Sequence, residues 1–398
     1  MRIELAEGVY WVGAIDWDIR DFHGYTTPRG TTYNAYLIVD EKVALVDTVK
    51  AEFAEEMLGR IGEIIDPGEI DYVVSNHAEG DHSGAMTRVL EVAREARVVA
   101  TARGKDALLK HYKMDWPTTT VKTGETLGLG KTHLRFIEAP MLHWPDSMFT
   151  YVAEKKILLP NDAFGQHMAT AERFEDEVEG GLVMEEAAKY YANILMPFGP
   201  LITKQLEKLC EMGVEVETIA PSHGLIWRRD PGRILEAYRR WAQAETKEKV
   251  LVIYDTMWGT TERMARTIAE DLAKEVEVKL FNLRRTDYSE VVREVLDARA
   301  VLVGSPTLNG GMFWTVGGFL TYLKGLRPRG RIGAAFGSYG WGRGAVKAIN
   351  KELKEAGMEV LEPGLEVRYR PDEGELQECR SFCSKFLEKV KAPKAPIG

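Results

Sequence analysis

Four side chains that can bind a metal fall within six positions of one short stretch, residues 75–84. Its sequence, Ser-Asn-His-Ala-Glu-Gly-Asp-His-Ser-Gly, supplies two imidazoles and two carboxylates, on His77, Glu79, Asp81 and His82. Both kinds of group are common ligands of transition metals. A polar, solvated turn would be the better interpretation of a lone His-x-Glu, but four donors at this density favour a metal site.

The segments on either side predict that a loop presents these side chains. Residues 72–74 form an apolar run typical of a buried strand, and residues 83–93 have helical periodicity with Ser83 as the cap. A loop held at both ends can direct successive side chains at one centre, whereas helical spacing would separate them. We therefore expect all four donors on a strand-to-helix loop.

Three further donors occur where an apolar run stops and a Pro or Gly bends the chain: His143, Asp162 and His223. Each alone is weak evidence, because an Asp after a strand usually marks a turn and a single His is usually hydrogen-bonded structure. Together with the first loop they make four imidazoles and three carboxylates. That set can give two metals three terminal ligands each, with one Asp shared.

The identity of these donors indicates iron. Zinc hydrolases of a similar layered fold typically carry His-x-His-x-Asp-His, and here Glu79 fills the second His position. A carboxylate in place of an imidazole adds negative charge and a harder oxygen donor, which favours iron or manganese and stabilises the trivalent state. A redox-active di-iron centre is the best-matched occupant.

The first half of the chain mixes strands and helices, with hairpins as frequent as crossovers. This pattern favours two sheets packed as a sandwich with helices outside. The expected strands are residues 9–12, 36–39, 43–46, 72–74, 98–100, 118–121, 133–137, 148–152 and 157–159, and the expected helices span residues 51–64, start near residue 104 and span residues 233–241.

The second half alternates strictly between strand and helix after a polar linker at residues 244–248, which predicts a doubly wound parallel sheet. We expect one domain over residues 1–247 and a second over residues 248–398. The expected strands are residues 250–254, 276–281, 300–304, 332–336 and a strand from residue 359; the helices are residues 261–275, 289–298, from 313, 344–356 and after 374.

Ligands of such sheets bind beyond the carboxyl ends of the strands, where three loops of this half should converge. The first offers hydroxyls and backbone N–H groups at a helix N-terminus, suited to a phosphate dianion, and the others offer glycines and stacking aromatics. Three such loops predict a bound flavin mononucleotide (FMN). The candidate contacts are Thr256, Met257, Trp258, Gly259, Thr260 and Thr261; Pro306, Thr307, Leu308, Asn309 and Gly310; and Ser338, Tyr339, Gly340, Trp341 and Gly342.

Composition and net charge argue against several classes of protein. The net charge of −9 and the pI near 5.6 argue against nucleic acid or an anionic membrane as partner, and three scattered cysteines argue against a disulfide scaffold. No leader or membrane-length apolar run is evident, so we expect a cytoplasmic protein. Cys379 and Cys383 are expected to be core residues or a chance pair, Cys210 a buried small hydrophobe, and residues 391–398 a frayed tail.

These residues resemble the flavodiiron proteins over essentially the whole chain. The resemblance rests on His77-x-Glu79-x-Asp81-His82, on the segments around His143 and His223, and on the flavodoxin-like half. It implies a metallo-β-lactamase-like αββα sandwich followed by a flavodoxin-like domain. By the same resemblance His77, Glu79 and His143 would bind one iron, Asp81, His82 and His223 the other, and Asp162 would bridge them.

The family implies reduction of dioxygen to water, of nitric oxide to nitrous oxide, or of both, with electrons relayed through FMN. A reduced flavin and a di-ferrous pair hold two electrons each, which matches the four that dioxygen requires. The family also implies a rubredoxin-type donor, or reduced deazaflavin in some relatives, and a head-to-tail homodimer or dimer of dimers.

Two other functions fit part of the pattern. One is a di-zinc hydrolase with an accessory flavodoxin-like domain, which metal analysis would reveal. The other is an electron-transfer protein whose metal half is structural, which would cycle flavin without consuming gas. The sequence leaves open the choice of gas and donor, ligation by His82, a gas-pocket or merely structural role for His23 and Tyr191, and a supporting or catalytic role for His167.

Overall fold

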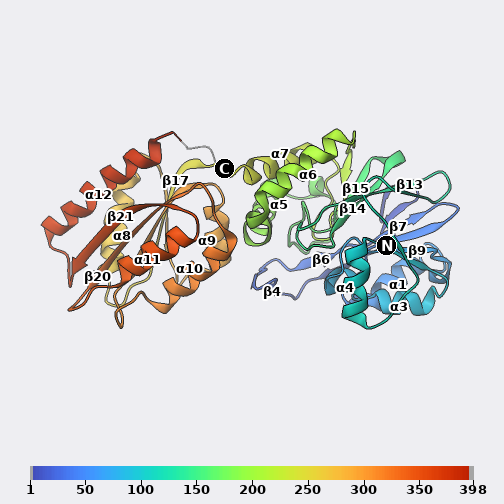
Figure 1. The fold of residues 1–398 in the computed structure, drawn as a ribbon, viewed down its shortest axis with the longest axis horizontal. Coiled ribbons are helices and arrows are strands. Elements are labelled where there is room, and N and C mark those ends of the chain that lie inside the picture. Colours follow the sequence, from blue (N-terminus) through green and yellow to red (C-terminus); the bar gives the residue numbers. More distant parts are fainter. Residues whose placement is uncertain (1–2, 394–398) are drawn as a thin grey trace. The chain divides into compact units, whose positions relative to one another are not determined.

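A computed structural model describes residues 3–393. Within them the chain divides into two compact units, the first running through residues 3–190 and 200–239 and the second through residues 191–199 and 240–393 (Figure 1). Our boundary after residue 247 stays a prediction; strand β17 begins at Lys247, inside the expected linker.

Two sheets lie face to face in the first unit. One has the strand order β1 (Ile3–Ala6), β2 (Val9–Trp11), β7 (Tyr36–Val39), β8 (Val43–Val46), β9 (Tyr72–Val74), β10 (Arg97–Ala100) and β11 (Thr118–Thr120). The other has the order β12 (Thr126–Gly128), β13 (His133–Glu138), β14 (Met148–Val152), β15 (Ile157–Leu159) and β16 (Thr218–Ile219). Two short ribbons pair β3 (Ala14–Asp16) with β6 (Thr31–Tyr33) and β4 (Asp21–Phe22) with β5 (Tyr25–Thr26).

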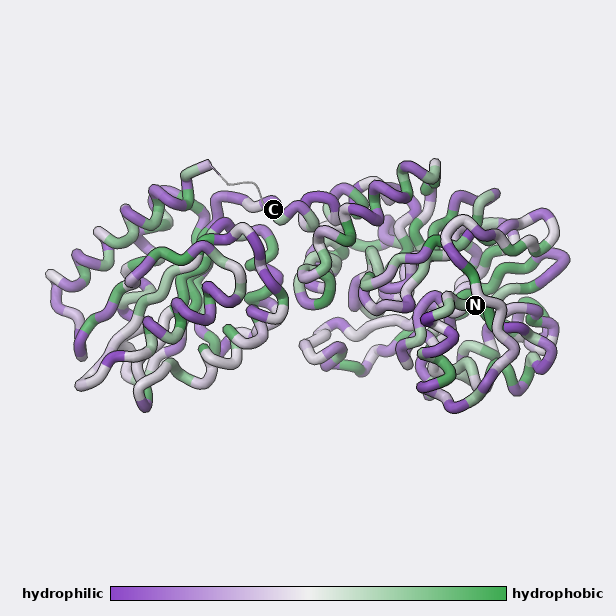
Figure 2. The backbone as a smooth tube through the Cα atoms, viewed as in Figure 1, coloured by the Kyte–Doolittle hydropathy of each residue, from purple (hydrophilic) through white to green (hydrophobic). Residues whose placement is uncertain are grey.

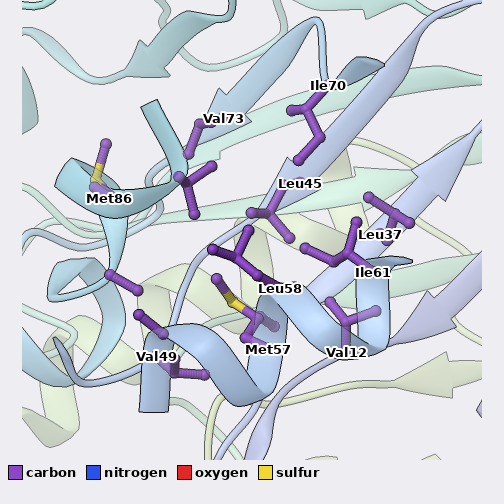
Figure 3. Close-up of a cluster of buried hydrophobic side chains, with 14 of the residues drawn as sticks. Val12, Leu37, Leu45, Val49, Met57, Leu58, Ile61, Ile70, Val73 and Met86 are labelled. Carbon is purple, nitrogen blue, oxygen red and sulfur yellow. The ribbon is translucent and has the colours of Figure 1, made fainter. Parts of the chain in front are cut away.

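Successive side chains of these strands point to opposite faces of the sheet, so hydrophobic residues build a layer on each face of the larger sheet. Trp11, Tyr36 and Ile38 from the larger sheet pack with Phe136 and Met148 from the smaller one, which closes the space between the sheets. The opposite face of the larger sheet packs against helices α1 (Ala54–Gly62), α3 (Met86–Val92) and α4 (Ala102–Tyr112). Figure 3 shows the side chains from α1 and α3 in this cluster beside Leu37, Leu45 and Val73 of the sheet. Helices α5 (Gly180–Tyr190), α6 (Gly199–Glu211) and α7 (Pro231–Ala242) follow later in the chain.

The second unit is a parallel sheet with the order β18 (Glu277–Asn282), β17 (Lys247–Tyr254), β19 (Ala298–Pro306), β20 (Ile332–Tyr339) and β21 (Glu359–Arg368). Its helices are α8 (Thr260–Leu272), α9 (Tyr288–Val295), α10 (Trp314–Leu326), α11 (Ala345–Glu355) and α12 (Glu373–Lys391). Hydrophobic stretches follow the strands, while the helices alternate between hydrophobic and polar segments (Figure 2). This arrangement confirms the predicted doubly wound sheet.

Several local predictions were wrong. Asp81 and His82 lie not on a loop but in a one-turn helix, α2 (Gly80–Ser83), and Ser83 is its last residue instead of a cap. Cys210 is exposed, although Cys379 and Cys383 are buried in α12 as expected. The predicted tail falls partly outside the described residues, since only residues up to 393 are described and Lys391 still belongs to α12.

Candidate metal centre and cofactor cavity

The seven predicted metal donors come together in the first unit, although they come from distant parts of the chain. His77 and Glu79 lie between β9 and α2, Asp81 and His82 lie within α2, and His143 lies between β13 and β14. Asp162 follows β15 and His223 follows β16, two strands that pair in parallel. Parallel pairing puts the carboxyl ends of these two strands at one edge, which explains how residues 61 positions apart meet.

Asp162 stands between two groups of donors and presents one carboxylate oxygen to each. Its Oδ2 lies 3.5 Å from His143 Nε2 and 3.9 Å from His77 Nε2. Glu79 Oε2 completes that group, at 3.2 Å from His77 Nε2 and 3.3 Å from His143 Nε2. Ligand atoms about 2.1 Å from a shared ion lie roughly 3 to 3.5 Å apart, so this spacing fits one metal.

The other oxygen of Asp162 faces the second group. Its Oδ1 lies 3.2 Å from His82 Nε2 and 3.5 Å from His223 Nε2. Asp81 Oδ2 lies 3.3 Å from His82 Nε2 and 3.1 Å from His223 Nε2. The two groups match the two ligand sets implied by the family resemblance, with His82 in contact range like the others.

Many of these short contacts lack the geometry of hydrogen bonds. Nε2 of His82, His143 and His223, both oxygens of Asp81 and Oδ2 of Asp162 are buried atoms without a hydrogen-bond partner among the described residues. Buried polar atoms are normally paired, because leaving one unpaired costs about 1–3 kcal/mol. Orphaned donors gathered around one carboxylate fit two bound metal ions.

Electrostatics agree with this interpretation. Burial alone would lower the pKa of His223, but close contacts with Asp162 and Asp81 raise that pKa to about 10. The pKa of Asp162 is well below its usual value despite burial, because of the charge of His82 and the contacts with His223. The carboxylates thus raise the pKa of His77, His82 and His223 against the effect of burial, which shows that this site favours positive charge.

Hydrogen bonds outside this ring of donors set the direction of two imidazoles and of Asp162. His223 Nδ1 lies 2.7 Å from the carbonyl oxygen of Thr32, and His77 Nδ1 lies 3.1 Å from Asp146 Oδ2, which leaves Nε2 of each facing the centre. The Tyr190 hydroxyl donates to Asp162 Oδ1 over 2.7 Å. Sequence reasoning missed Asp146 and Tyr190, because no local pattern marks a hydrogen-bond partner that is far away in sequence.

The three residues whose roles the sequence left open, His23, His167 and Tyr191, do not all lie in the same unit. His23, in the turn between β4 and β5, has its Nε2 3.7 Å from Glu79 Oε1, and burial lowers the pKa of His23 to about 4. His167 is bonded through Nδ1 to the Thr31 hydroxyl at 2.8 Å, outside the donor groups. Tyr191 belongs to the second unit and contacts the Trp241 ring, so Tyr190 rather than Tyr191 reaches the metal centre.

A cavity of about 710 Å³ lies at the carboxyl edge of the parallel sheet in the second unit. It is lined by Thr256, Met257, Trp258, Thr260, Pro306, Thr307, Leu308, Asn309, Ser338, Tyr339, Gly340, Trp341, Tyr369 and Arg370. The backbone N–H of Thr307 donates to the carbonyl of Ser338 over 2.7 Å, which ties the loop after β19 to strand β20. Trp258 and Trp341 are 87% and 94% exposed. Apolar rings so exposed around a cavity are suited to packing on a flat aromatic ligand.

Four of the predicted flavin contacts are not among the described residues that line this cavity: Gly259, Thr261, Gly310 and Gly342. Gly259 caps α8 with φ of +79°, and the Thr261 hydroxyl lies 3.1 Å from that of Ser338. Ser338 and Tyr339 belong to β20 rather than to a loop, and Pro306 belongs to β19. Tyr369 and Arg370, which follow β21, were not predicted.

Comparisons with known proteins agree with both halves. The family model described as flavodoxin matches residues 252–382, and that described as ODP family beta lactamase matches residues 31–224. The chain is 53% identical to a nitric oxide reductase of Moorella thermoacetica over 98% of each chain. It resembles the solved rubredoxin oxygen:oxidoreductase of Desulfovibrio gigas (TM-score 0.96, 41% identity, covering 98% of this chain and 99% of that one). It also resembles the flavodiiron protein of Giardia intestinalis (TM-score 0.93, 37% identity, 99% of each chain).

A metallo-β-lactamase-like sandwich followed by a flavodoxin-like sheet defines a two-domain metalloflavoprotein. The chain belongs to the flavodiiron proteins. Within residues 3–393, no helix has both the length and the apolar character needed to cross a bilayer.

Proposed function

We propose that this protein reduces dioxygen to water, nitric oxide to nitrous oxide, or both, at a non-heme di-iron centre supplied with electrons by FMN. The observation that carries the proposal is the position of Asp162, whose two oxygens face two separate groups of imidazole and carboxylate donors. The names of the related proteins, a nitric oxide reductase and a rubredoxin oxygen:oxidoreductase, support both gases as substrates.

We assign His77, Glu79 and His143 to one iron, Asp81, His82 and His223 to the other, and Asp162 to both. The three carboxylates offset most of the charge of two ferrous ions, and the orphaned donor atoms described above support the assignment. When bound, the two irons supply a binding site for the gas and two of the electrons.

The flavodoxin-like unit holds FMN in its cavity. The loop that leads into α8, with Thr256, and the first helical residue, Thr260, offer hydroxyls and N–H groups to the phosphate, while Trp258, Tyr339 and Trp341 offer faces to the ring. The cavity volume of about 710 Å³ lies in the range of small-molecule sites.

Unequal exposure of the two donor groups suggests a path for the gas. The side chains of Asp81, His82 and His223 are 0–4% exposed, whereas Glu79 is 22% and His143 11% exposed. The turn that carries His23 lies beside Glu79. We propose that the gas approaches past Glu79 and His143, while the other group is sealed from solvent.

We further propose a rubredoxin-type electron donor, as the name of the Desulfovibrio gigas relative suggests, with reduced deazaflavin as the alternative. A head-to-tail homodimer, or a dimer of such dimers, and a cytoplasmic location complete the proposal.

An anaerobic titration of the fully reduced protein with each gas tests this function. We expect flavin reoxidation and consumption of the gas in a fixed ratio, with water or nitrous oxide as product and close to two irons per chain. A zinc-only protein that consumes neither gas would contradict the proposal and would revive the hydrolase alternative, which the comparisons do not favour.

A further inference from the structure

Asp146 is a buried carboxylate next to the metal centre that is not one of its seven donors. Only 4% of its side chain is exposed, and its Oδ2 accepts two hydrogen bonds, from the backbone N–H of Ala78 at 2.8 Å and from His77 Nδ1 at 3.1 Å. A carboxyl oxygen that accepts from a backbone N–H and faces an imidazole nitrogen is favoured in its charged form, because both contacts stabilise the carboxylate. Asp146 therefore places a negative charge against a predicted ligand.

The position of Asp146 in the chain gives this contact a second effect. Asp146 lies three residues after His143, in the segment between β13 and β14, while Ala78 directly follows His77. Its carboxylate thus joins the two segments that bring His77 and His143 to the same group of donors. The hydroxyl of Thr101 donates to the Asp146 carbonyl at 3.0 Å and fixes this segment from the other side.

In the other group of donors, no carboxylate among the described residues is hydrogen-bonded to the far nitrogen of an imidazole, although the buried Asp47 interacts electrostatically with His82. His223 Nδ1 faces the backbone carbonyl oxygen of Thr32 at 2.7 Å, and His82 Nδ1 has no hydrogen-bond partner among the described residues. The donors that we assign are balanced, with two imidazoles and one carboxylate in each group besides Asp162, and His23 is a further imidazole beside Glu79. A carboxylate hydrogen-bonded to the far nitrogen of an imidazole is thus present in the first group and, among the described residues, not in the second.

We infer that Asp146 is a positioning residue that fixes His77 with Nε2 toward the metal and gives the His77–Glu79–His143 group the stronger hold on its ion. A carboxylate that accepts from the far nitrogen of a metal-bound imidazole makes that imidazole a more basic ligand. The added negative charge also lowers the reduction potential of the iron in that group relative to its neighbour. This inference rests on the proposed di-iron site.

The test is an anaerobic titration of metal-free protein with ferrous ion against a competing chelator. For Asp146→Asn, which keeps the size of the side chain and removes its charge, we expect one of the two binding constants to weaken 10- to 100-fold and the other to stay unchanged. In the same variant, the midpoint potential of one iron, followed by electron paramagnetic resonance, should be higher than in the wild type. Equal weakening at both sites, or no change at either, would overturn the inference.

Ser147→Ala is the matched control, because Ser147 is the next residue and is equally buried, and its hydroxyl bonds to the Trp144 N–H within the same segment. We expect its binding constants to equal those of the wild type; weakening like that of Asp146→Asn would mean that the order of the segment, not the charge, matters. A wild type that binds no ferrous ion would instead contradict the proposed function.

A measurement on the wild type covers the case in which Asp146→Asn does not fold. In protein loaded with diamagnetic zinc, nitrogen-15 spectra should show His77 protonated at Nδ1 and metal-bound at Nε2. A proton on Nε2 of His77 would overturn the assignment.

Discussion

At the scale of single residues, this site depends on which atom of each side chain faces the centre. Asp162 uses both oxygens, and contacts to Thr32 and Asp146 leave Nε2 of His223 and His77 directed inward. That these seven side chains meet could be predicted, because four donors within six positions mark a site and three more donors follow strand ends elsewhere in the chain. The hydrogen-bond partners of these donors could not be predicted. Thr32, for example, contacts His223 through its backbone carbonyl, and every residue type has one.

His143→Ala tests the ligand set directly. We expect iron content to fall and gas reduction to drop by more than about 100-fold, since outer partners of a metal ligand alone are worth 10–100-fold. FMN content should be unchanged, because the flavin cavity belongs to the other unit. Iron and FMN per chain and the rate of gas consumption are the measurements.

The control for that variant is His133→Ala. His133 is half exposed on β13 and pairs with Glu154 at 2.7 Å, away from the donors. It should retain both irons and full activity, and retained turnover in His143→Ala would show that the ligand assignment is wrong.

At the scale of elements, apolar strands were predicted whatever their length, whereas strand β6 was missed. Residues 43–46 and 148–152 match β8 and β14. Strand β6, with the sequence Thr-Thr-Tyr, carries no apolar alternation and is held by pairing with β3. Cys210 was mispredicted because α6 was not recognised: adjacent helix residues point about 100° apart, and Leu209 takes the buried direction.

Helix α2 explains the error at Asp81 and His82. Its single turn is closed by bonds from the N–H groups of His82 and Ser83 to the carbonyl of Glu79. In a longer helix, donors further along would point in other directions around the helix axis. In this single turn, the side chains of residues 81 and 82 both lie on the side of the metal centre. Dense donors in a short segment are thus compatible with helix when the helix stops at once.

The close packing of β19 on β20 below the flavin cavity predicts a sensitive position at Gly304. A Cβ there would overlap the ring of the buried Phe336, so Gly304→Ala should destabilise the flavodoxin-like unit by about 1–3 kcal/mol and weaken FMN binding. Denaturant unfolding followed by flavin fluorescence measures both effects.

Gly325→Ala provides the comparison, because a Cβ at this position of α10 meets nothing within 4 Å. Alanine in a helix is favoured over glycine by about 1 kcal/mol, so this variant should be neutral or more stable. An equal decrease in the free energy of unfolding in Gly304→Ala and Gly325→Ala would contradict the packing argument.

Helix α12 buries two of the three cysteines, which predicts selective thiol chemistry. Burial raises the pKa of Cys379 to about 11 and that of Cys383 to about 12, so both stay protonated at pH 8, and only above pH 11 does a large thiolate fraction form. Iodoacetamide at pH 8 should modify exposed Cys210 alone in the native protein, as mass spectrometry would show. Rapid modification of Cys383 would place α12 away from the core.

At the scale of the whole molecule, two units with separate hydrophobic cores carry two separate cofactor sites. The division was predictable from the change between mixed and strictly alternating elements along the sequence. The assignment of residues 191–199 to the second unit could not be predicted. This short segment contacts residues far away in the sequence, as in the 2.6 Å hydrogen bond from the Tyr322 hydroxyl to Asn193.

Separate cores predict separate responses to ligands. In calorimetry of protein stripped of both cofactors, FMN at 100 times its dissociation constant should stabilise one transition by about 2.7 kcal/mol, or roughly 5–10 °C, and leave the other in place. Ferrous ion should move only the other transition. A single transition displaced by both ligands would show that the two units unfold together.

The wide spread of the donors along the chain also sets an order of events during biosynthesis. Ribosomes release a chain from its N-terminus, and His223 is the last of the seven donors to emerge. A nascent chain that already exposes His77 to Asp162 holds all of one group of donors and two of the three donors of the other. Full metal loading must therefore wait until more than half of the polypeptide has been made, and a ribosome stalled before that point would leave a centre able to take up one ion but not two.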